Sequence, residues 1–258
     1  MKTKKFFIQK YINNRPLFHA FIRPTEALLF YKNKTFIKSP SLDFGCGDGF
    51  FCEAVFGKRK IDVGIDIQNS RAEEAFRLNI YKKNVFYEGK RIPFPNNYFK
   101  TIVSNCVLEH IPDLDSSLKE LNRILEPGGY FLTTVMTDKW EDSLVGSKLF
   151  GKKYIKFMRS VQKHINLFSE RMWSIFFEKN GFIIEKKINY FSEQESKYNE
   201  IFHYLSLPSL ISYKLIKKWV IWPSAYSILI KQYFFKQKYI IKKKFKHTTA
   251  VFFILRKK

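Results

Sequence analysis

The stretch Ser41-Leu42-Asp43-Phe44-Gly45-Cys46-Gly47-Asp48-Gly49 decides how this 258-residue chain is organised. Its apolar start predicts a short buried strand. The three glycines at alternate positions predict a tight turn where a ligand can approach the backbone closely. A helix is expected to begin near Asp48, and the free N–H groups at such a helix start favour a bound carboxylate.

Two classes of ligand use a glycine turn of this kind, and the spacing helps to separate them. A dinucleotide-binding turn follows the pattern G-x-G-x-x-G and holds a pyrophosphate. Here the pattern is G-x-G-x-G, and Asp43 precedes it. An acid has no use beside a pyrophosphate, but it can hold an ammonium group. The turn alone therefore modestly favours a nucleotide that carries an amino acid.

The composition indicates a folded intracellular protein. The length suits one large domain, or a domain with an appendage. Cys46, Cys52 and Cys106 form no CxxC pair and no even disulfide framework, which points to a reducing cytosol. The first ten residues are basic but lack the apolar core of a signal peptide, and no apolar run reaches the roughly 18 residues that span a bilayer. A cytoplasmic location is expected.

The net charge of +23 is concentrated at the two ends of the chain. Residues 201–258 contain thirteen Lys or Arg and no acid, and residues 1–41 contain nine basic residues and one acid. Basic ends favour contact with an anionic surface, either a membrane or a nucleic acid. The alternative is a lysine bias without functional meaning.

The middle of the chain alternates between strand-like and helix-like segments. Strands are expected at 42–44, 61–66, 84–88, 101–106 and 130–135, and helices at 70–79 and 114–125. This alternation predicts a parallel sheet with helices on both faces. Ligands of such sheets bind beyond the carboxyl ends of the strands. Asp43, Asp66, Glu88 and Asn105 end successive strands and are expected to line one crevice.

Four motifs in order identify a family. They are Leu42–Gly49, the segment Ile92-Pro93-Phe94-Pro95-Asn96-Asn97-Tyr98-Phe99, then Val107-Leu108-Glu109-His110-Ile111, then Leu125-Glu126-Pro127-Gly128-Gly129. Over residues 40–135 the chain closely resembles the class I S-adenosylmethionine-dependent methyltransferases, specifically the type-11 methyltransferase family. A dinucleotide dehydrogenase would not carry the last three motifs.

The resemblance implies an α/β fold of the doubly wound, Rossmann-like kind. Its seven-stranded sheet would be mostly parallel, with the last strand antiparallel and helices on both faces. The expected layout is a helical cap at 1–38, a cofactor-binding core at 39–191, a basic, aromatic helical insertion at 192–247 and the last strand at 248–258. Pro16 and Pro24 are expected to break the cap into short helices. Near the second break, Arg23 and Glu26 are expected to form a surface ion pair; the alternative is that they face the crevice.

The resemblance also implies roles for residues at the strand ends. Asp43 would hold the ammonium group of S-adenosylmethionine, and the glycine turn would hold its carboxylate. Asp66 would accept hydrogen bonds from the ribose, and Glu88 from the adenine amino group. The complete set expected to bind the cofactor is Asp43, Gly45, Cys46, Gly47, Gly49, Asp66, Ile67, Glu88, Gly89, Asn105 and Cys106.

Two histidines are candidates for a general base that would deprotonate an acceptor hydroxyl. His110 lies in the third motif, where packing at a helix start is the alternative role. His164 opens a segment that resembles one near the substrate pocket of relatives, and it is the preferred candidate. No cluster with metal-ligand spacing stands out, so no metal is expected.

The acceptor is expected to be small or lipid-linked. The insertion mixes Trp, Tyr and Lys, a combination that suits a membrane interface, although a lid packed on the core is the alternative. An RNA methyltransferase is the second expectation. Enzymes that methylate base amines carry an Asn/Asp-Pro-Pro-aromatic run at this position, and the residues after Ser104 lack it, which disfavours this alternative. A non-catalytic cofactor-binding protein is the third. The sequence indicates no oligomeric state.

Overall fold

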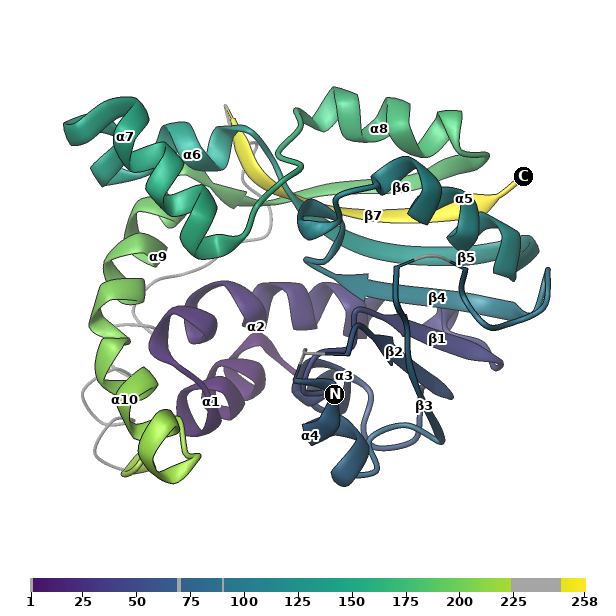
Figure 1. Ribbon diagram of the computed structural model, residues 1–258, viewed down its shortest axis with the longest axis horizontal. Coiled ribbons are helices and arrows are strands. Elements are labelled where there is room, and N and C mark those ends of the chain that lie inside the picture. The colour runs from purple at the N-terminus through teal and green to yellow at the C-terminus, as the bar shows by residue number, and fades with distance from the viewer. Residues whose placement is uncertain (1, 69–70, 90, 224–246) are drawn as a thin grey trace.

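The computed structural model describes residues 2–68, 71–89, 91–223 and 247–258. Within them, seven strands form one sheet in the order β3-β2-β1-β4-β5-β7-β6 (Figure 1). The strands are β1 (Ser41–Phe44), β2 (Val63–Asp66), β3 (Lys83–Phe86), β4 (Phe99–Asn105), β5 (Leu125–Met136), β6 (Phe182–Ser192) and β7 (Thr248–Lys257). Strands β1 to β5 pair in parallel, and β7 runs antiparallel to both of its neighbours, β5 and β6. The expected fold class is confirmed.

Helices precede, separate and follow the strands. They are α1 (Lys4–Asn14), α2 (Leu17–Lys32), α3 (Phe50–Val55), α4 (Ala72–Arg77), α5 (Leu114–Ile124), α6 (Lys139–Ser143), α7 (Val145–Gln162), α8 (Glu170–Lys179), α9 (Glu193–Leu205) and α10 (Leu207–Ile216), with the short 3-10 helices η1 (Lys34–Phe36) and η2 (Leu108–His110). The periodic leucines that predict a helix at 114–125 lie on the buried face of α5.

Two hydrophobic clusters fill the two faces of the sheet. Phe252 and Ile254 of β7 belong to the cluster that also contains α1 and α2, whereas Phe253 and Leu255 belong to the cluster under α5 and α8. This division follows from the strand, whose successive side chains point to opposite faces. Figure 1 shows α5 and α8 on one side of the sheet and α1 and α2 on the other. Because both faces are covered, the ligand site is left at the strand ends.

The N-terminal cap differs from the expectation at one proline. Pro16 precedes α2 and separates it from α1, as expected, but Pro24 lies inside α2 without ending it. A proline in a helix interior costs a backbone hydrogen bond. Here the buried face of α2, which includes Phe21 and Leu28, packs into the core and offsets that loss. The expected break at Pro24 is therefore wrong.

The insertion before β7 begins with two helices. A capping box between Ser192 and Glu195 starts α9, and α10 follows after a single residue. Tyr213 of α10 stacks on Trp219 with ring centroids 4.0 Å apart, and the Arg71 guanidinium lies over both rings. The insertion thus packs beside α4 and the glycine turn. The remaining part of the predicted basic, aromatic insertion, residues 224–246, lies outside the described residues.

Strand β5 begins earlier than the expected range 130–135, and β6 is also long. Strand β5 already begins at Leu125, because this residue pairs with Phe99, and the Pro127-Gly128-Gly129 turn lies within the same strand. Strand β6 continues to Ser192 because its whole length pairs with β7. Among the described helices, none is both long and apolar enough to cross a membrane.

Candidate functional site

The glycine turn after β1 has the backbone conformation that its sequence predicts. Gly45, Gly47 and Gly49 all have positive φ angles, of 75°, 51° and 72°. A Cβ atom added to Gly45 would lie 2.4 Å from the Val107 side chain, so the turn packs closely against η2. A Cβ added to Gly47 would meet nothing within 4 Å, because this glycine faces open space. The turn therefore presents bare backbone to a ligand at Gly47.

A cavity of about 320 Å³ lies over this turn. Five of the predicted cofactor residues line it: Asp43, Gly45, Cys46, Gly47 and Asn105. The cap contributes Tyr11, Arg15, His19 and Arg23, and the remaining lining residues are Asp48, Phe50, Phe51 and Arg71. We call this the cofactor cavity. The carboxyl ends of the strands and the N-terminal helices thus enclose this cavity together.

Asp43 lies at the floor of the cofactor cavity with its side chain buried. Its carboxyl group accepts a hydrogen bond of 2.6 Å from the Tyr81 hydroxyl. Burial raises the pKa of Asp43 to about 7, an effect that the Tyr81 hydrogen bond partly offsets. A cationic group placed beside it would favour the ionised form.

Asp66 also reaches the glycine turn. Its carboxylate accepts hydrogen bonds from the backbone N–H groups of Gly47, at 2.6 Å, and Ile67, at 2.7 Å. Three other members of the predicted set, Ile67, Glu88 and Gly89, are exposed and do not line the cofactor cavity. Gly49 is buried at the start of α3. The cavity therefore gathers only part of the predicted set.

Two arginines face Asp48 at the mouth of the cofactor cavity. Arg15 and Arg71 approach the same carboxylate oxygen at 2.8 and 2.9 Å. Arg71 also pairs with Glu74 at 2.7 Å, so the two guanidinium groups face two carboxylates and the cluster carries no net charge. The N–H groups of the two guanidinium groups are the donors that an anionic ligand group such as a carboxylate would use.

A buried acid joins the cap to β4. Glu26 is 0 % exposed, and its carboxylate accepts hydrogen bonds from Arg23 at 2.7 Å, Asn105 at 3.0 Å and Tyr190 at 2.8 Å. The Cys106 thiol donates a longer one of 3.5 Å. The expected Arg23–Glu26 ion pair is thus present, but its expected surface location is wrong. The pair belongs to the wall of the site.

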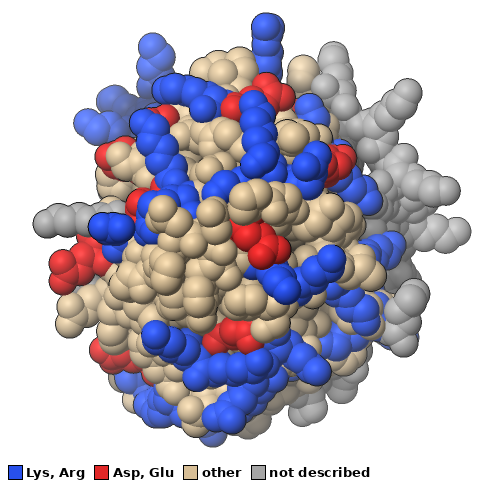
Figure 2. All heavy atoms as spheres, turned by 90° about the vertical axis from the view of Figure 1, so that its right-hand side faces the viewer, with Lys and Arg blue, Asp and Glu red and all other residues tan. Residues whose placement is uncertain are grey.

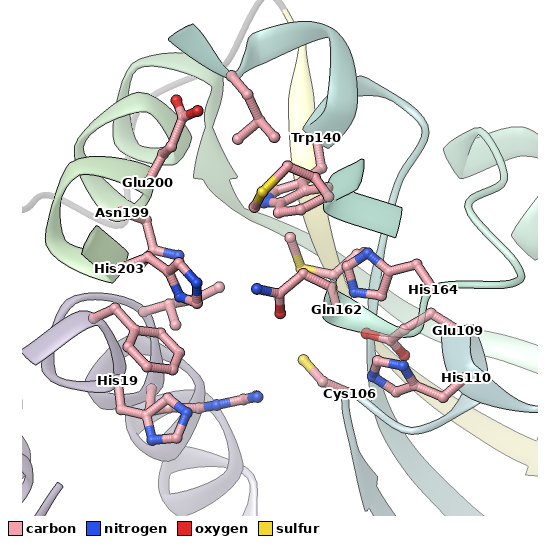
Figure 3. A pocket seen from close by; sticks show the side chains of 16 residues that line it. His19, Cys106, Glu109, His110, Trp140, Gln162, His164, Asn199, Glu200 and His203 are labelled. Atoms are coloured by element: carbon pink, nitrogen blue, oxygen red, sulfur yellow. The ribbon is translucent and has the colours of Figure 1, made fainter. Parts of the chain in front are cut away.

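A second cavity, of about 90 Å³, lies beside the first. His19 and Arg23 line both cavities, and Cys106 lines the second one (Figure 3). Its apolar lining is Phe18, Ile22, Met136, Trp140, Leu144 and Met158, and its remaining polar lining is Glu109, His110, Gln162, His164, Asn199, Glu200 and His203. We call it the acceptor cavity, after the role that we propose for it below. Glu200 holds the start of α7 by accepting hydrogen bonds from the N–H groups of Val145 and Gly146.

Both predicted histidines lie in the acceptor cavity, next to an acid that had no predicted role. Figure 3 shows Glu109 between His164 and His110 on one wall. The two histidine rings are 5.1 Å apart between centroids. Glu109 is 0 % exposed, and neither of its carboxylate oxygens has a hydrogen-bond partner among the described residues. Glu109 and His110 are adjacent in the sequence, but His164 is far from them, so sequence spacing alone does not group the three side chains.

Burial shifts the pKa of all three groups toward the neutral form. Burial raises the pKa of Glu109 to about 7. It lowers the pKa of His164 to about 3, with the neighbouring His110 adding to the effect, and it lowers the pKa of His110. Near neutral pH both rings are therefore uncharged and carry a free lone pair.

The sequence interpretation missed three lining residues, Arg15, His19 and Arg71, and it placed Arg23 and Glu26 at the crevice only as the alternative. All except Arg71 belong to the cap, far from the motifs in the sequence. One feature of the sequence could have revealed the role of the cap: Glu26 is the one acid among the nine basic residues of 1–41. A single acid in an apolar helix is a candidate for burial with a partner.

The residues present fit S-adenosylmethionine. The bare backbone at Gly47 leaves room for its amino-acid end, the guanidinium groups of Arg15 and Arg71 are hydrogen-bond donors for a carboxylate, and the buried Asp43 matches an ammonium. Asp66 stands at the end of β2, where an acid can reach ribose hydroxyls.

Comparison with known proteins agrees with this fit. A family model described as a methyltransferase domain matches residues 15–187. Arginine-hydroxylase NDUFAF5 of Rattus norvegicus is 31 % identical over 96 residues, which cover 36 % of this chain and 27 % of that protein. Ubiquinone biosynthesis O-methyltransferase of Thiobacillus denitrificans is 29 % identical over 123 residues, covering 44 % and 50 %. The matched segment is at most half of either relative.

Solved structures share the fold over nearly the whole chain. A possible histamine N-methyltransferase from Thermotoga maritima aligns with a TM-score of 0.60 at 18 % identity and covers 94 % of this chain and 92 % of its own. Geranyl diphosphate C-methyltransferase from Streptomyces coelicolor, solved with S-adenosylhomocysteine, has a TM-score of 0.56 at 15 % identity and covers 90 % and 78 %. Because the family model spans the glycine turn, both histidines and most of the sheet, this chain belongs to the methyltransferase-domain family, in the S-adenosylmethionine-dependent class I.

Proposed function

We propose that this protein transfers a methyl group from S-adenosylmethionine to a small or lipid-linked acceptor held in the acceptor cavity. The observation that carries the proposal is the shared wall of the two cavities. His19 and Arg23 line both, and the neighbouring residues Asn105 and Cys106 line one cavity each. A cofactor in one cavity and an acceptor in the other would meet at this wall.

The protein's main task in such a transfer is orientation. Bound S-adenosylmethionine would supply an electrophilic methyl group, which the acceptor attacks in line while S-adenosylhomocysteine leaves. Holding two reactants in near-attack geometry contributes several kcal/mol to lowering a barrier. Asn105 is fixed for this purpose from two sides, because its amide donates to Glu26 and its carbonyl oxygen accepts from the Thr134 hydroxyl at 2.8 Å.

The lining of the acceptor cavity favours an acceptor with an apolar body and a polar reacting end. Met136, Trp140 and Met158 form apolar walls, whereas Glu109, His110 and His164 concentrate polar atoms on one side. The names of two relatives, the ubiquinone biosynthesis O-methyltransferase and a sterol 24-C-methyltransferase of Schizosaccharomyces pombe, point to apolar acceptors of this kind.

His164 remains the proposed proton acceptor for a hydroxyl, with His110 as its neighbour. A general base works best when its pKa lies near the working pH. Since burial holds the pKa of His164 at about 3, its ring is free to accept a proton but is a weak base. An acceptor hydroxyl would therefore need additional acidification within the cavity.

We further propose that the acceptor is collected from an anionic membrane surface on the cytoplasmic side. Helix α7 supports this. The backbone is non-helical at Gly151; after this break, Met158 and Gln162 line the acceptor cavity, and before it, Leu149 and Phe150 are 71 % and 66 % exposed. Its exposed lysines are Lys148, Lys152, Lys153 and Lys156, and residues 143–169 contain no acid. Exposed apolar side chains among lysines are typical of helices that lie in a membrane interface. Figure 1 shows α7, α9 and α10 along one side of the molecule.

The RNA alternative has less support. On the face that Figure 2 shows, Lys and Arg side chains are dispersed, and Asp and Glu lie among them. Phosphate-backbone binding favours a stripe of basic side chains, and this face, which lies on the side of the molecule away from α7, presents none. The residues after Ser104 also lack an Asn/Asp-Pro-Pro-aromatic run. Turnover of S-adenosylmethionine with any acceptor would distinguish an enzyme from the alternative of a non-catalytic cofactor-binding protein.

One experiment tests the proposed function. Calorimetry of the purified full chain should show binding of S-adenosylmethionine and of S-adenosylhomocysteine. Release of S-adenosylhomocysteine should then accelerate with one member of a panel of polyprenyl phenols, isoprenoid diphosphates and lipid-linked sugars. Binding without turnover on any of them would favour the non-catalytic alternative. Absence of binding by folded protein would defeat the proposal.

A further inference from the structure

The wall of the acceptor cavity contains an unsatisfied set of metal-ligand atoms. One ligand atom each from Glu109, His110 and His164 lies within 4.8 Å of the others. Glu109 is fully buried, and its carboxylate makes no hydrogen bond of normal geometry among the described residues, although the backbone N–H groups of Glu109 and Met136 lie close enough to lower its pKa. Among the same residues His164 Nδ1 has no hydrogen-bond partner. A buried polar group without a partner is costly and points to a missing one.

His110 is oriented as a metal ligand would be. Its Nδ1 lies 3.0 Å from the Lys163 carbonyl oxygen, which can only accept a hydrogen bond. Nδ1 must therefore carry the proton, and the neutral ring keeps its lone pair on Nε2. Metal-bound histidines almost always donate their second N–H to a carbonyl or carboxylate in this way, which fixes the tautomer.

The loop that carries His164 is fixed to the other two residues. The backbone N–H groups of Ile165 and Asn166 both donate to the Glu109 carbonyl oxygen, at 2.8 and 2.9 Å. The Asn166 side chain donates to the carbonyl oxygens of Leu108 and Ile111. The three side chains therefore come from two segments, 108–111 and 164–166, whose backbones are hydrogen-bonded to each other. These hydrogen bonds fix the distances between the three side chains.

We propose that Glu109, His110 and His164 bind a divalent transition-metal ion, such as Zn²⁺ or Fe²⁺. Two imidazoles and one carboxylate form a ligand set that suits these ions and leaves positions open for a further ligand. Among the lining residues of the cavity the cationic side chain is Arg23, which is paired with Glu26, and Arg159 beside His164 is paired with Glu141, so both charges oppose a bound cation less.

Resting on the proposed function, the ion would have a role in the reaction. An acceptor oxygen placed on an open position of the ion would lose its proton to water more readily, because a bound cation lowers the pKa of a hydroxyl ligand. The oxygen would then take the methyl group as S-adenosylhomocysteine leaves, and His164 would hold the ion in place of the proton-accepting role proposed above. This role of the ion favours acceptors that present a hydroxyl, phenol or enol oxygen to the wall formed by Glu109, His110 and His164.

Binding of Co²⁺ to the metal-free full chain tests the site. Co²⁺ substitutes for Zn²⁺ and absorbs visible light when it is held by protein ligands. Titration should give one Co²⁺ per chain, and Zn²⁺ should displace it. Glu109→Gln and His110→Gln should each weaken Co²⁺ binding at least tenfold. His203→Ala removes a histidine from the same cavity but outside the ligand set and should leave Co²⁺ binding unchanged.

Two results would overturn the metal site. One is a folded wild-type chain that binds neither Co²⁺ nor Zn²⁺. The other is equal Co²⁺ binding by the wild type and by both Gln variants, with circular dichroism confirming that all are folded. Calorimetry with S-adenosylmethionine on the metal-free chain is a separate readout. Cofactor binding without metal binding would defeat only the metal site, whereas the reverse result would defeat the methyl-transfer proposal.

Discussion

The Asn105 amide donates a hydrogen bond of 3.0 Å to the buried Glu26 carboxylate, which connects α2 to the carboxyl end of β4. This contact makes the cap part of the cofactor cavity, because Glu26 also holds Arg23 in the wall between the two cavities. The arrangement explains why a polar residue in the middle of an apolar helix is compatible with the fold.

Replacing Glu26 is expected to destabilise the protein strongly. Glu26→Ala leaves the Arg23 charge uncompensated and removes the acceptor of Asn105 and Tyr190, and breaking a buried pair in this way costs about 3 kcal/mol or more. Urea unfolding measures the loss. Glu185→Ala is the control, because Glu185 pairs with Arg256 at the surface and its loss should cost under about 1 kcal/mol. Equal losses in both variants would contradict this account of Glu26.

Gly47 and Gly45 are expected to respond differently to the same substitution. Gly45→Ala places a Cβ atom 2.4 Å from Val107, so the folded state should be destabilised. Gly47→Ala meets open space and should cost only about 1 kcal/mol of backbone strain, but its methyl group would occupy the cofactor cavity. Thermal unfolding together with calorimetry separates the two effects. A Gly47→Ala variant with wild-type affinity for S-adenosylmethionine would place the cofactor elsewhere.

The sequence predicted the sheet well because its determinants are local. Strand-like runs that end in an acid, the glycine turn and the leucine period of 114–124 each act within a few residues. The walls of the site were harder to predict. His110 and His164 were recognised singly, but their proximity to each other and to Glu109 depends on backbone hydrogen bonds between distant segments. The role of Glu26 likewise depends on the packing of α2 over β4, which no local pattern encodes.

Titration of Asp43 is expected to couple cofactor binding to pH. Below about pH 7 its carboxyl is protonated, so the affinity for an ammonium group should fall as the pH drops through 7. Asp43→Asn keeps an acceptor for the Tyr81 hydroxyl but cannot ionise. Its affinity for S-adenosylmethionine should be weaker and independent of pH between 6 and 8. Calorimetry across this range is the measurement, and parallel pH profiles for the two proteins would contradict the assignment.

The same titration predicts the stability of the ligand-free protein. The pKa of Asp43 is about 7 when folded and near its ordinary value of about 3.9 when unfolded, so the folded chain holds an extra proton between these values. The free energy of unfolding of the wild type should therefore fall as the pH rises from about 4 to about 7. Relative to the wild type, Asp43→Asn should be more stable at pH 8, by up to about 4 kcal/mol, and should show no such advantage near pH 4. Urea unfolding at the two pH values measures both.

Contact of α7 with a membrane is tested on its outer face. The double variant Leu149→Glu and Phe150→Glu should reduce sedimentation of the full chain with vesicles of phosphatidylglycerol, because both side chains are exposed among lysines. Ile175→Glu on α8 is the matched control, since Ile175 is also exposed but lies on another helix. A full chain that sediments with neither anionic nor neutral vesicles would leave α7 as a plain wall of the acceptor cavity.

His164 is expected to act in turnover and not in cofactor binding. Its ring lies on the wall of the acceptor cavity, packed edge-on against Trp140 at 4.9 Å between centroids, and it does not line the cofactor cavity. His164→Ala should therefore lower kcat by about 10²-fold or more, whether the ring accepts the proton or holds the ion, while the Kd for S-adenosylmethionine stays within twofold. His247→Ala, which removes an exposed histidine outside both cavities, should change neither quantity. Near-normal turnover in His164→Ala would exclude this ring from the chemistry, whereas a parallel loss of cofactor affinity would mean that the ring supports the fold of the shared wall.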